Sequence, residues 1–126
     1  MTRLALAALG ALLLTACSSR VPADELAGSY EASYPFGSST LVLNADGTFV
    51  QEVTVKGQGS ATARGTWRFD AARSTLSLHG VMDVVDPYGD ILQDWRVVSD
   101  EPYVAVDQYW WRVNLVVCKE YPYIKR

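Results

Sequence analysis

The stretch TLVLNADGTFVQEVTVK, residues 40–56, decides the fold because it reads as two β-strands around a tight turn. Both flanking runs are rich in β-branched and aromatic residues, and Asp46-Gly47 stands between them. An Asp-Gly pair in that setting is the strongest short-range signal for a β-hairpin. Side chains alternate between the faces of a strand, so one face of the hairpin gathers apolar residues. The residues expected on that face are Leu41, Leu43, Phe49, Val53 and Val55.

The same alternation recurs on both sides of the hairpin. Strand-like runs at 28–34, 62–69, 76–79 and 111–117 are separated by turns, and strands at such regular, short spacing are typical of sandwiches and barrels. The pattern predicts an all-β domain, an antiparallel β-meander that closes into a small barrel or half-barrel. Side chains usually fill such small barrels. The large residues expected to fill this one are Tyr30, Tyr34, Phe49, Trp67, Phe69 and Trp111.

The stretch 90–98 is ambiguous between helix and strand. As a helix it gathers its apolar residues into one stripe, with Asp90 at the N-cap and Gln93 in the capping-box position. As a strand it places Gln93 on the same face as Trp95. The sequence therefore favours a short helix or helical turn at 90–98. The residues of the helical stripe are Ile91, Leu92, Trp95 and Val98.

An apolar segment precedes the strand-like region. Arg3 and the run of Leu, Ala and Gly at 4–14 have the layout of a secretory signal peptide. The run is well short of the roughly 20 apolar residues that a membrane-spanning helix needs. The segment is therefore expected to direct export rather than to span a bilayer.

The residues Leu14-Thr15-Ala16-Cys17 resemble the lipobox of bacterial lipoproteins. The resemblance implies that the signal peptide is cut before Cys17, that the sulfur of Cys17 carries a diacylglycerol and that the new N-terminus is acylated. Two lipid signals suffice for stable anchoring. Ser18 after the cysteine resembles lipoproteins of the outer membrane of diderm bacteria, where the domain would face the periplasm. The alternative is an ordinary signal peptide that is cleaved nearby.

On this reading the chain has three parts. Residues 1–16 are the signal peptide, residues 17–25 are the lipidated cysteine and a polar tether, and residues 26–126 are a single barrel domain. If Cys17 carries lipid, Cys118 has no partner for a disulfide within the chain. Cys118 is expected on the outer side of the last strand, as an inert and partly covered thiol.

A series of motifs between residues 28 and 78 resembles the lipocalin-like barrels of small bacterial envelope lipoproteins. The likeness implies the barrel fold and carries little information about function. Some of these barrels have a Cys-x-x-Cys near their start, where this chain has Tyr34-Pro35-Phe36-Gly37, so a copper or redox role does not follow. The motifs are Gly28-x-Tyr30, Leu41-x-Leu43-x-x-Asp46-Gly47-x-Phe49, Gly65-Thr66-Trp67 and Leu76-x-Leu78.

Composition argues against several classes of function. A net charge of -3 and a pI near 5.0 leave no basic footprint for phosphates, so nucleic acid is not an expected partner. One histidine and two cysteines are too few for a Cys/His zinc site. His79 has no Ser or Cys nucleophile at a motif spacing. No cofactor is expected.

Acidic residues concentrate between residues 83 and 107. The segment 86–90 offers oxygen ligands for a hard cation such as calcium, but its spacing matches no EF-hand. Solvated loops and edge strands commonly carry such charges, so no metal site is expected. An acidic or metal-assisted hydrolase is the alternative. The acidic residues are Asp83, Asp86, Asp90, Asp94, Asp100, Glu101 and Asp107.

Aromatic residues near the end of the chain are the candidate binding surface. Alternation along the strand expected at 111–117 turns Trp111 toward the core and Trp110 outward. Together with Tyr103 and Tyr109, an exposed Trp110 would offer a stacking surface to a ligand or partner. The alternative is that another part of the chain covers the ring.

Three functions remain open from the sequence. The first is a non-catalytic cell-envelope domain, joined to the membrane through Cys17, that binds a small apolar ligand or an envelope protein. The second is the hydrolase named above, and the third is a structural or inhibitory envelope protein. The lack of a catalytic motif favours the first and third, so the chain is not expected to be an enzyme.

Lipidation gives the first testable prediction. We expect Cys17→Ser to block acylation, and either to release the domain from membranes or to leave the precursor uncleaved, because the acyl chains supply the anchoring free energy. Fractionation and labelling with a radioactive fatty acid measure both effects. Wild-type protein that incorporates no fatty acid would contradict the lipobox assignment.

Overall fold

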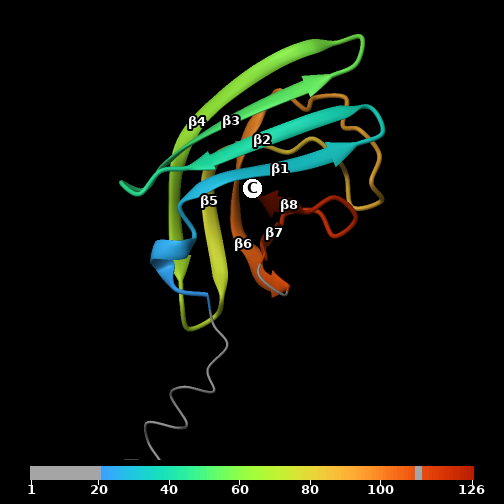
Figure 1. Cartoon of the computed structure of the whole chain (residues 1–126). Helices are drawn as coiled ribbons and strands as arrows, with labels where there is room; N and C mark the ends of the chain where they lie inside the picture. The colour runs from blue at the N-terminus through green and yellow to red at the C-terminus, as the bar shows by residue number, and fades with distance from the viewer. Residues whose placement is uncertain (1–20, 110–111) are drawn as a thin grey trace, which may run out of the picture.

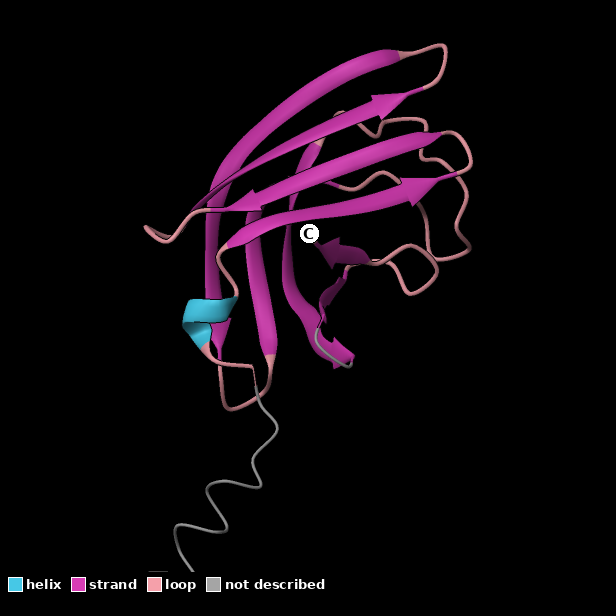
Figure 2. Ribbon diagram, viewed as in Figure 1, coloured by secondary structure: helices cyan, strands magenta, loops and turns pink. Residues whose placement is uncertain are grey.

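Eight antiparallel strands follow one another around a closed barrel in the order of the chain, and the last strand pairs with the first (Figure 1). The computed structural model describes residues 21–109 and 112–126. Figure 2 shows that strands make up nearly all of the regular structure. The meander predicted from strand spacing is confirmed. The strands are β1 (Gly28–Tyr34), β2 (Gly37–Leu43), β3 (Thr48–Val55), β4 (Gly59–Asp70), β5 (Thr75–Met82), β6 (Val98–Tyr109), β7 (Arg112–Val116) and β8 (Tyr123–Lys125).

The hairpin of β2 and β3 forms as predicted. Its turn is closed by the Asn44 amide, which donates to the Thr48 carbonyl at 2.8 Å. Asp46 Oδ1 accepts from the Thr48 hydroxyl at 2.6 Å and from the Thr48 amide at 3.0 Å, and these bonds lower the pKa of the Asp46 carboxyl. Gly47 has a φ of +90°, which residues with a side chain rarely adopt. The Asp-Gly pair thus supplies both the acceptor and the backbone geometry of the turn.

The apolar face predicted for this hairpin lies inside the barrel. Tyr34, Trp67 and Phe69, also expected to fill the interior, are only partly buried and pack against the edge of the main core. Trp111 lies outside the described residues. The predicted interior residues that are buried are Tyr30, Leu41, Leu43, Phe49, Val53 and Val55. Other buried residues of the strands include Ala32, Leu76, Leu78, Val113 and Leu115.

The folded domain begins before residue 26, where the sequence predicted the boundary between tether and barrel. Val21 and Leu26 are buried in the main core, on either side of the short 3₁₀ helix η1 (Ala23–Glu25). The Tyr30 hydroxyl donates to the Leu26 carbonyl at 2.6 Å, and burial raises the pKa of Tyr30 to about 12. Residues 21–25, expected in the tether, therefore belong to the folded domain. No described helix is long and apolar enough to cross a membrane.

The connection between β5 and β6, residues 83–97, contains no helix. Of the short helix or helical turn expected at 90–98, a turn forms, at residues 93–96. The Val97 amide closes this turn by donating to the Asp94 carbonyl at 3.0 Å. The apolar residues of 90–98 are spaced like the stripe of a helix. The buried one among them, Trp95, packs instead against residues of distant strands.

Trp95 makes those contacts. Its side chain is fully buried, and its indole N–H donates to Gln58 Oε1 in the β3–β4 turn at 2.8 Å. The Arg96 guanidinium lies over the same ring, 4.3 Å from its centroid. Trp95 thereby holds the β5–β6 connection against the barrel. The buried residues of this second core cluster are Val53, Val55, Ala63, Met82, Val84 and Trp95.

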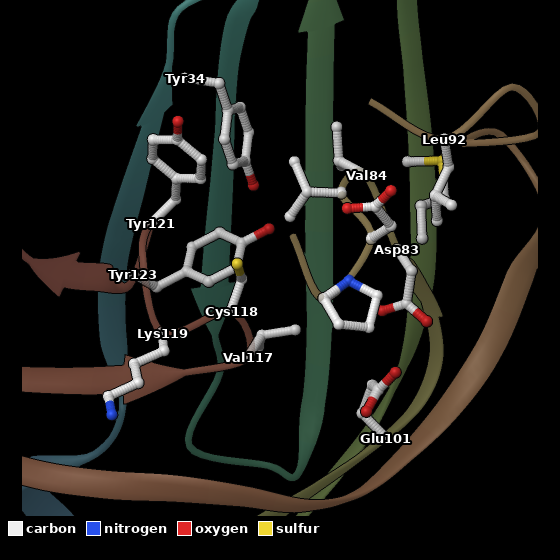
Figure 3. A pocket seen from close by; sticks show the side chains of 14 residues that line it. Tyr34, Asp83, Val84, Leu92, Glu101, Val117, Cys118, Lys119, Tyr121 and Tyr123 are labelled. Carbon is white, nitrogen blue, oxygen red and sulfur yellow. The ribbon is translucent and has the colours of Figure 1, made fainter. Parts of the chain in front are cut away.

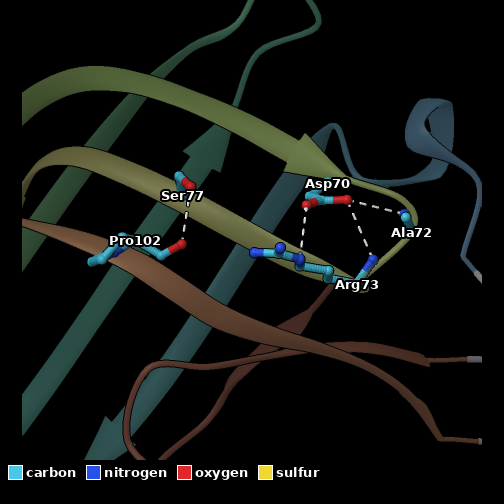
Figure 4. A network of polar contacts seen from close by, with 5 residues as sticks. All are labelled: Asp70, Ala72, Arg73, Ser77 and Pro102. Atoms are coloured by element: carbon cyan, nitrogen blue, oxygen red, sulfur yellow. Dashed lines mark hydrogen bonds and ion pairs between the residues drawn. The ribbon is translucent and has the colours of Figure 1, made fainter.

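The two ends of the barrel carry different connections. Because neighbouring strands are antiparallel, successive connections lie at opposite ends. The loop end carries the β1–β2 and β3–β4 turns together with the β5–β6 and β7–β8 connections, and the N-terminal end carries η1 with the β2–β3 and β4–β5 turns (Figure 1). In the β4–β5 turn, Asp70 Oδ1 accepts from the amides of Ala72 and Arg73 at 3.1 and 3.3 Å (Figure 4). Tight turns thus form the N-terminal end, and the longer connections lie at the loop end.

Gly65 of β4 gives a prediction about packing. A Cβ there would collide with the carbonyl oxygen of His79 and lie 2.7 Å from the Phe49 ring. We expect Gly65→Ala to lower the free energy of unfolding by about 1–3 kcal/mol, the range for overpacking. In the control Gly57→Ala, a Cβ meets nothing within 4 Å and only backbone strain remains. Chemical denaturation measures both, and a Gly65→Ala variant as stable as wild type would contradict the position of β4.

Candidate functional site

A cavity of about 500 Å³ lies at the loop end of the barrel (Figure 3). It is lined from the end of β1, the end of β5 with the β5–β6 connection, the start of β6, and the β7–β8 connection with β8. The lining combines apolar side chains with carboxyl and phenol groups. The apolar lining residues are Met82, Val84, Val85, Pro87, Leu92 and Val117.

A buried cluster of polar side chains, here called the polar floor, is formed by Ser39, Gln51 and Tyr123, and Tyr123 also lines the cavity. The Tyr123 hydroxyl is 2.6 Å from Ser39 Oγ and accepts from Gln51 Nε2 at 3.0 Å. Gln51 also bonds both backbone groups of Met82, donating to its carbonyl at 3.0 Å and accepting from its amide at 2.8 Å. Burial raises the pKa of Tyr123, so its phenol stays neutral. The floor therefore joins β2, β3, β5 and β8 through neutral hydrogen bonds.

Aromatic rings form one wall above the floor. Tyr34 stacks on Phe36 with ring centroids 5.1 Å apart, and Tyr121 meets Tyr34 edge-on at 5.4 Å. Burial, followed by the neighbouring Tyr123, raises the pKa of Tyr34 well above its ordinary value. The Tyr34 phenol is thus neutral at physiological pH, and the rings of the wall are held in place by one another.

An irregularity in β6 turns Glu101 toward the cavity. Leu76 of β5 pairs with Val104, but Leu78 pairs with Glu101, so β6 has one residue more than β5 over this step. The Ser77 hydroxyl donates to the Pro102 carbonyl within the irregular step at 3.0 Å (Figure 4). Both Val104 and Glu101 therefore face inward, although strict alternation would place them on opposite faces.

Asp83 and Glu101 form a pair of carboxyl groups in the cavity. Partial burial, a hydrogen bond with Asp83 and the negative charge of Asp83 raise the pKa of Glu101 to about 7. Ser99 Oγ donates to Asp83 Oδ2 at 2.9 Å, which orients that carboxylate. Near neutral pH, the pair therefore carries a proton that an isolated glutamate would have released.

Asp86 and Asp100, also predicted as candidates, have structural partners of their own, and Asp86 lines the cavity as well. Asp86 Oδ1 accepts from the amides of Tyr88 and Asp90 at 2.8 and 3.0 Å, which shapes the tip of the β5–β6 connection. Asp100 lies 2.6 Å from His79 Nδ1 on the exposed side of the barrel. Across residues 21–109 and 112–126, no three His, Cys, Asp or Glu side chains gather in a way that could hold a metal ion.

Of the predicted aromatic surface, the structure places the side chain of Tyr103, which is 74% exposed and does not line the cavity. Trp110 and the side chain of Tyr109 fall outside what the structure describes. The placement expected for Cys118 is wrong. Strand β7 ends at Val116, so the alternation that would put Cys118 on the outer side stops before it, and Cys118 lines the cavity instead.

Sequence reasoning missed most of the site. The sequence did contain a signal for Gln51, because this residue shares a strand face with Phe49 and Val53. A polar residue on a core face needs a hydrogen-bond partner inside the protein. Nothing local marks Tyr121 or Tyr123, because they follow an irregular segment. Comparison of the chain with protein-family models, curated proteins and solved structures finds no match.

The carboxyl pair predicts a dependence of stability on pH. Glu101 has a raised pKa in the folded state, so between pH of about 4.5 and 7 the unfolded chain has released a proton that the folded chain retains. The free energy of unfolding should therefore fall as the pH rises through this window. Glu101→Gln should flatten the dependence in thermal melts, and Glu52→Gln, at an exposed site on β3, should not. Equal slopes in both variants would contradict the assignment.

Proposed function

We propose that this chain is a lipid-anchored, non-catalytic domain of the cell envelope that binds a small molecule with an apolar part in the loop-end cavity. The observation that carries the proposal is the cavity itself. Its volume, about 500 Å³, lies within the range of small-molecule sites. A largely apolar lining with a few fixed polar groups is also what such sites have in common.

The position of the proposed anchor suits a cavity that exchanges ligand with the aqueous phase. Val21 is fixed in the core at the N-terminal end of the barrel and follows Cys17 by four positions. At 3.3–3.6 Å per residue, that linker spans at most roughly 14 Å. A bilayer attached through Cys17 would therefore lie at the N-terminal end, and the cavity at the loop end would face away from the membrane.

The carboxyl pair raises the question of acid–base hydrolysis, because Glu101 with its raised pKa retains a proton that it could donate. In glycoside hydrolysis, however, the two carboxyl groups stand about 5 Å or more apart on either side of the substrate bond. The hydrogen bond between Asp83 and Glu101 leaves no such gap, so it disfavours glycoside hydrolysis. The proposed binding role rests on the cavity and its apolar lining.

A neutral fluorescent probe, N-phenyl-1-naphthylamine, tests the proposal on a chain that begins at Ser18 and keeps every described residue. We expect saturable binding with enhanced emission, because the probe leaves water for the apolar lining. Val117→Phe should abolish binding, since Val117 lines the cavity. Val116→Phe, one position earlier on the outer side of β7, should leave it intact.

Two results would contradict the proposal. One is a wild-type chain that gives no saturable signal. The other is equal loss of binding in Val117→Phe and Val116→Phe when thermal melts show both variants to be folded, because the probe would then bind outside the cavity.

A further inference from the structure

We propose that the cavity takes an amphiphilic organic cation, whose protonated amine contacts both Asp83 and Glu101 and whose hydrocarbon part lies against the apolar lining. The inference rests on the proposed function, because it names the ligand class of the same cavity. It follows from three features of the cavity: an uncompensated carboxyl pair, an apolar lining, and the position of its one lysine.

The carboxyl pair lacks a positive partner. Asp83 belongs to the β5–β6 connection and Glu101 to β6, and they meet in the cavity. Within residues 21–109 and 112–126, the recorded ion pairs are Arg73 with Asp70, His79 with Asp100 and Arg126 with Glu31, so no basic side chain neutralises either cavity carboxyl. Partly buried negative charge without a partner is unfavourable, and a ligand cation supplies the missing charge.

Lys119 is the one basic residue that lines the cavity. Figure 3 shows its side chain extending to the side of the cavity opposite Asp83 and Glu101. Burial keeps the phenols of Tyr34 and Tyr123 neutral by raising their pKa values, and Asp86 adds a third acid, so the balance inside the cavity is negative. An anionic ligand is therefore disfavoured. The titratable groups that line the cavity with the pair are Tyr34, Asp86, Cys118, Lys119, Tyr121 and Tyr123.

The cation displaces a proton from the carboxyl pair when it binds. With the pKa of Glu101 at about 7, an ammonium group that replaces the hydrogen bond between the two carboxyls favours the ionised form and releases the proton to solvent. An alkylamine stays protonated, since its pKa is close to that of lysine, about 10.4. Its affinity should therefore rise with pH, being about tenfold weaker at pH 6 than at pH 8.

Three probes with the same eight-carbon chain separate charge from apolar burial. Calorimetric titration of the chain from Ser18 onward would use n-octylamine, 1-octanol and octanoate at pH 6 and pH 8. At pH 8 we expect the amine to bind about tenfold tighter than the alcohol, the gain expected of a charge-assisted contact, and octanoate to bind weakest. In two buffers of different ionisation enthalpy, the amine should release up to one proton.

Glu101→Gln keeps the shape of the protonated side chain and removes its titration. We expect the variant to lose most of the preference for amine over alcohol, together with its pH dependence, and to bind 1-octanol as wild type does. Glu52→Gln, on the outer face of β3, is the matched control and should behave as wild type.

The outcomes are distinguishable. If 1-octanol or octanoate binds wild type as tightly as the amine, the cation is not selected and this inference fails, while the proposed binding function stands. The inference also fails if Glu101→Gln retains the full amine preference. If none of the three probes binds, the proposed function fails with it.

Discussion

The rest of the barrel depends on the hydrogen bonds that the Tyr123 hydroxyl makes with Ser39 and Gln51. Strand β8 spans only Tyr123–Lys125 and makes two register pairs with each of its neighbours, β1 and β7. So short a strand gains little from its backbone ladder alone. The Tyr123 side chain extends its reach across the interior to Ser39 and Gln51, and Gln51 continues to the backbone of Met82. A buried polar group without a partner is costly. Loss of one hydrogen bond in this network would therefore leave a buried polar group unpaired at the next.

This polar floor also explains why the interior is not packed solid. Below it, the main core fills the N-terminal half with residues such as Leu26 and Phe49. On the loop side, Trp95 is drawn toward the β3–β4 turn, where Gln58 accepts its indole N–H, and so it packs beside the cavity rather than in it. The space that remains is bounded by tyrosine rings, by the β5–β6 connection and by a carboxyl pair. Two packed core clusters and a cavity thus coexist in one small barrel.

The regular part of the fold could be predicted from sequence, because alternation and turn chemistry are local. Asp46-Gly47 and the faces of β2 and β3 follow from neighbouring residues, and the structure confirms them. The site could not be predicted in the same way. Glu101 faces inward only because an irregular step in β6 shifts its alternation, and Cys118 lines the cavity because β7 ends before it. Of the short helix or helical turn expected at 90–98 only a turn forms, for a related reason, since Trp95 finds its partner 37 residues away.

A double-mutant cycle on Gln51 and Tyr123 tests the central claim most directly. Tyr123→Phe removes the hydroxyl, and Gln51→Leu removes the amide together with the bonds to Met82. The cycle isolates the coupling between the two side chains, because the other losses cancel. Equilibrium denaturation of the wild type, both single variants and the double variant should give a coupling free energy of about 1 kcal/mol or more, within the range for residues that share a network. Additive losses would contradict the account, because the short closing strand would then be held without the polar floor.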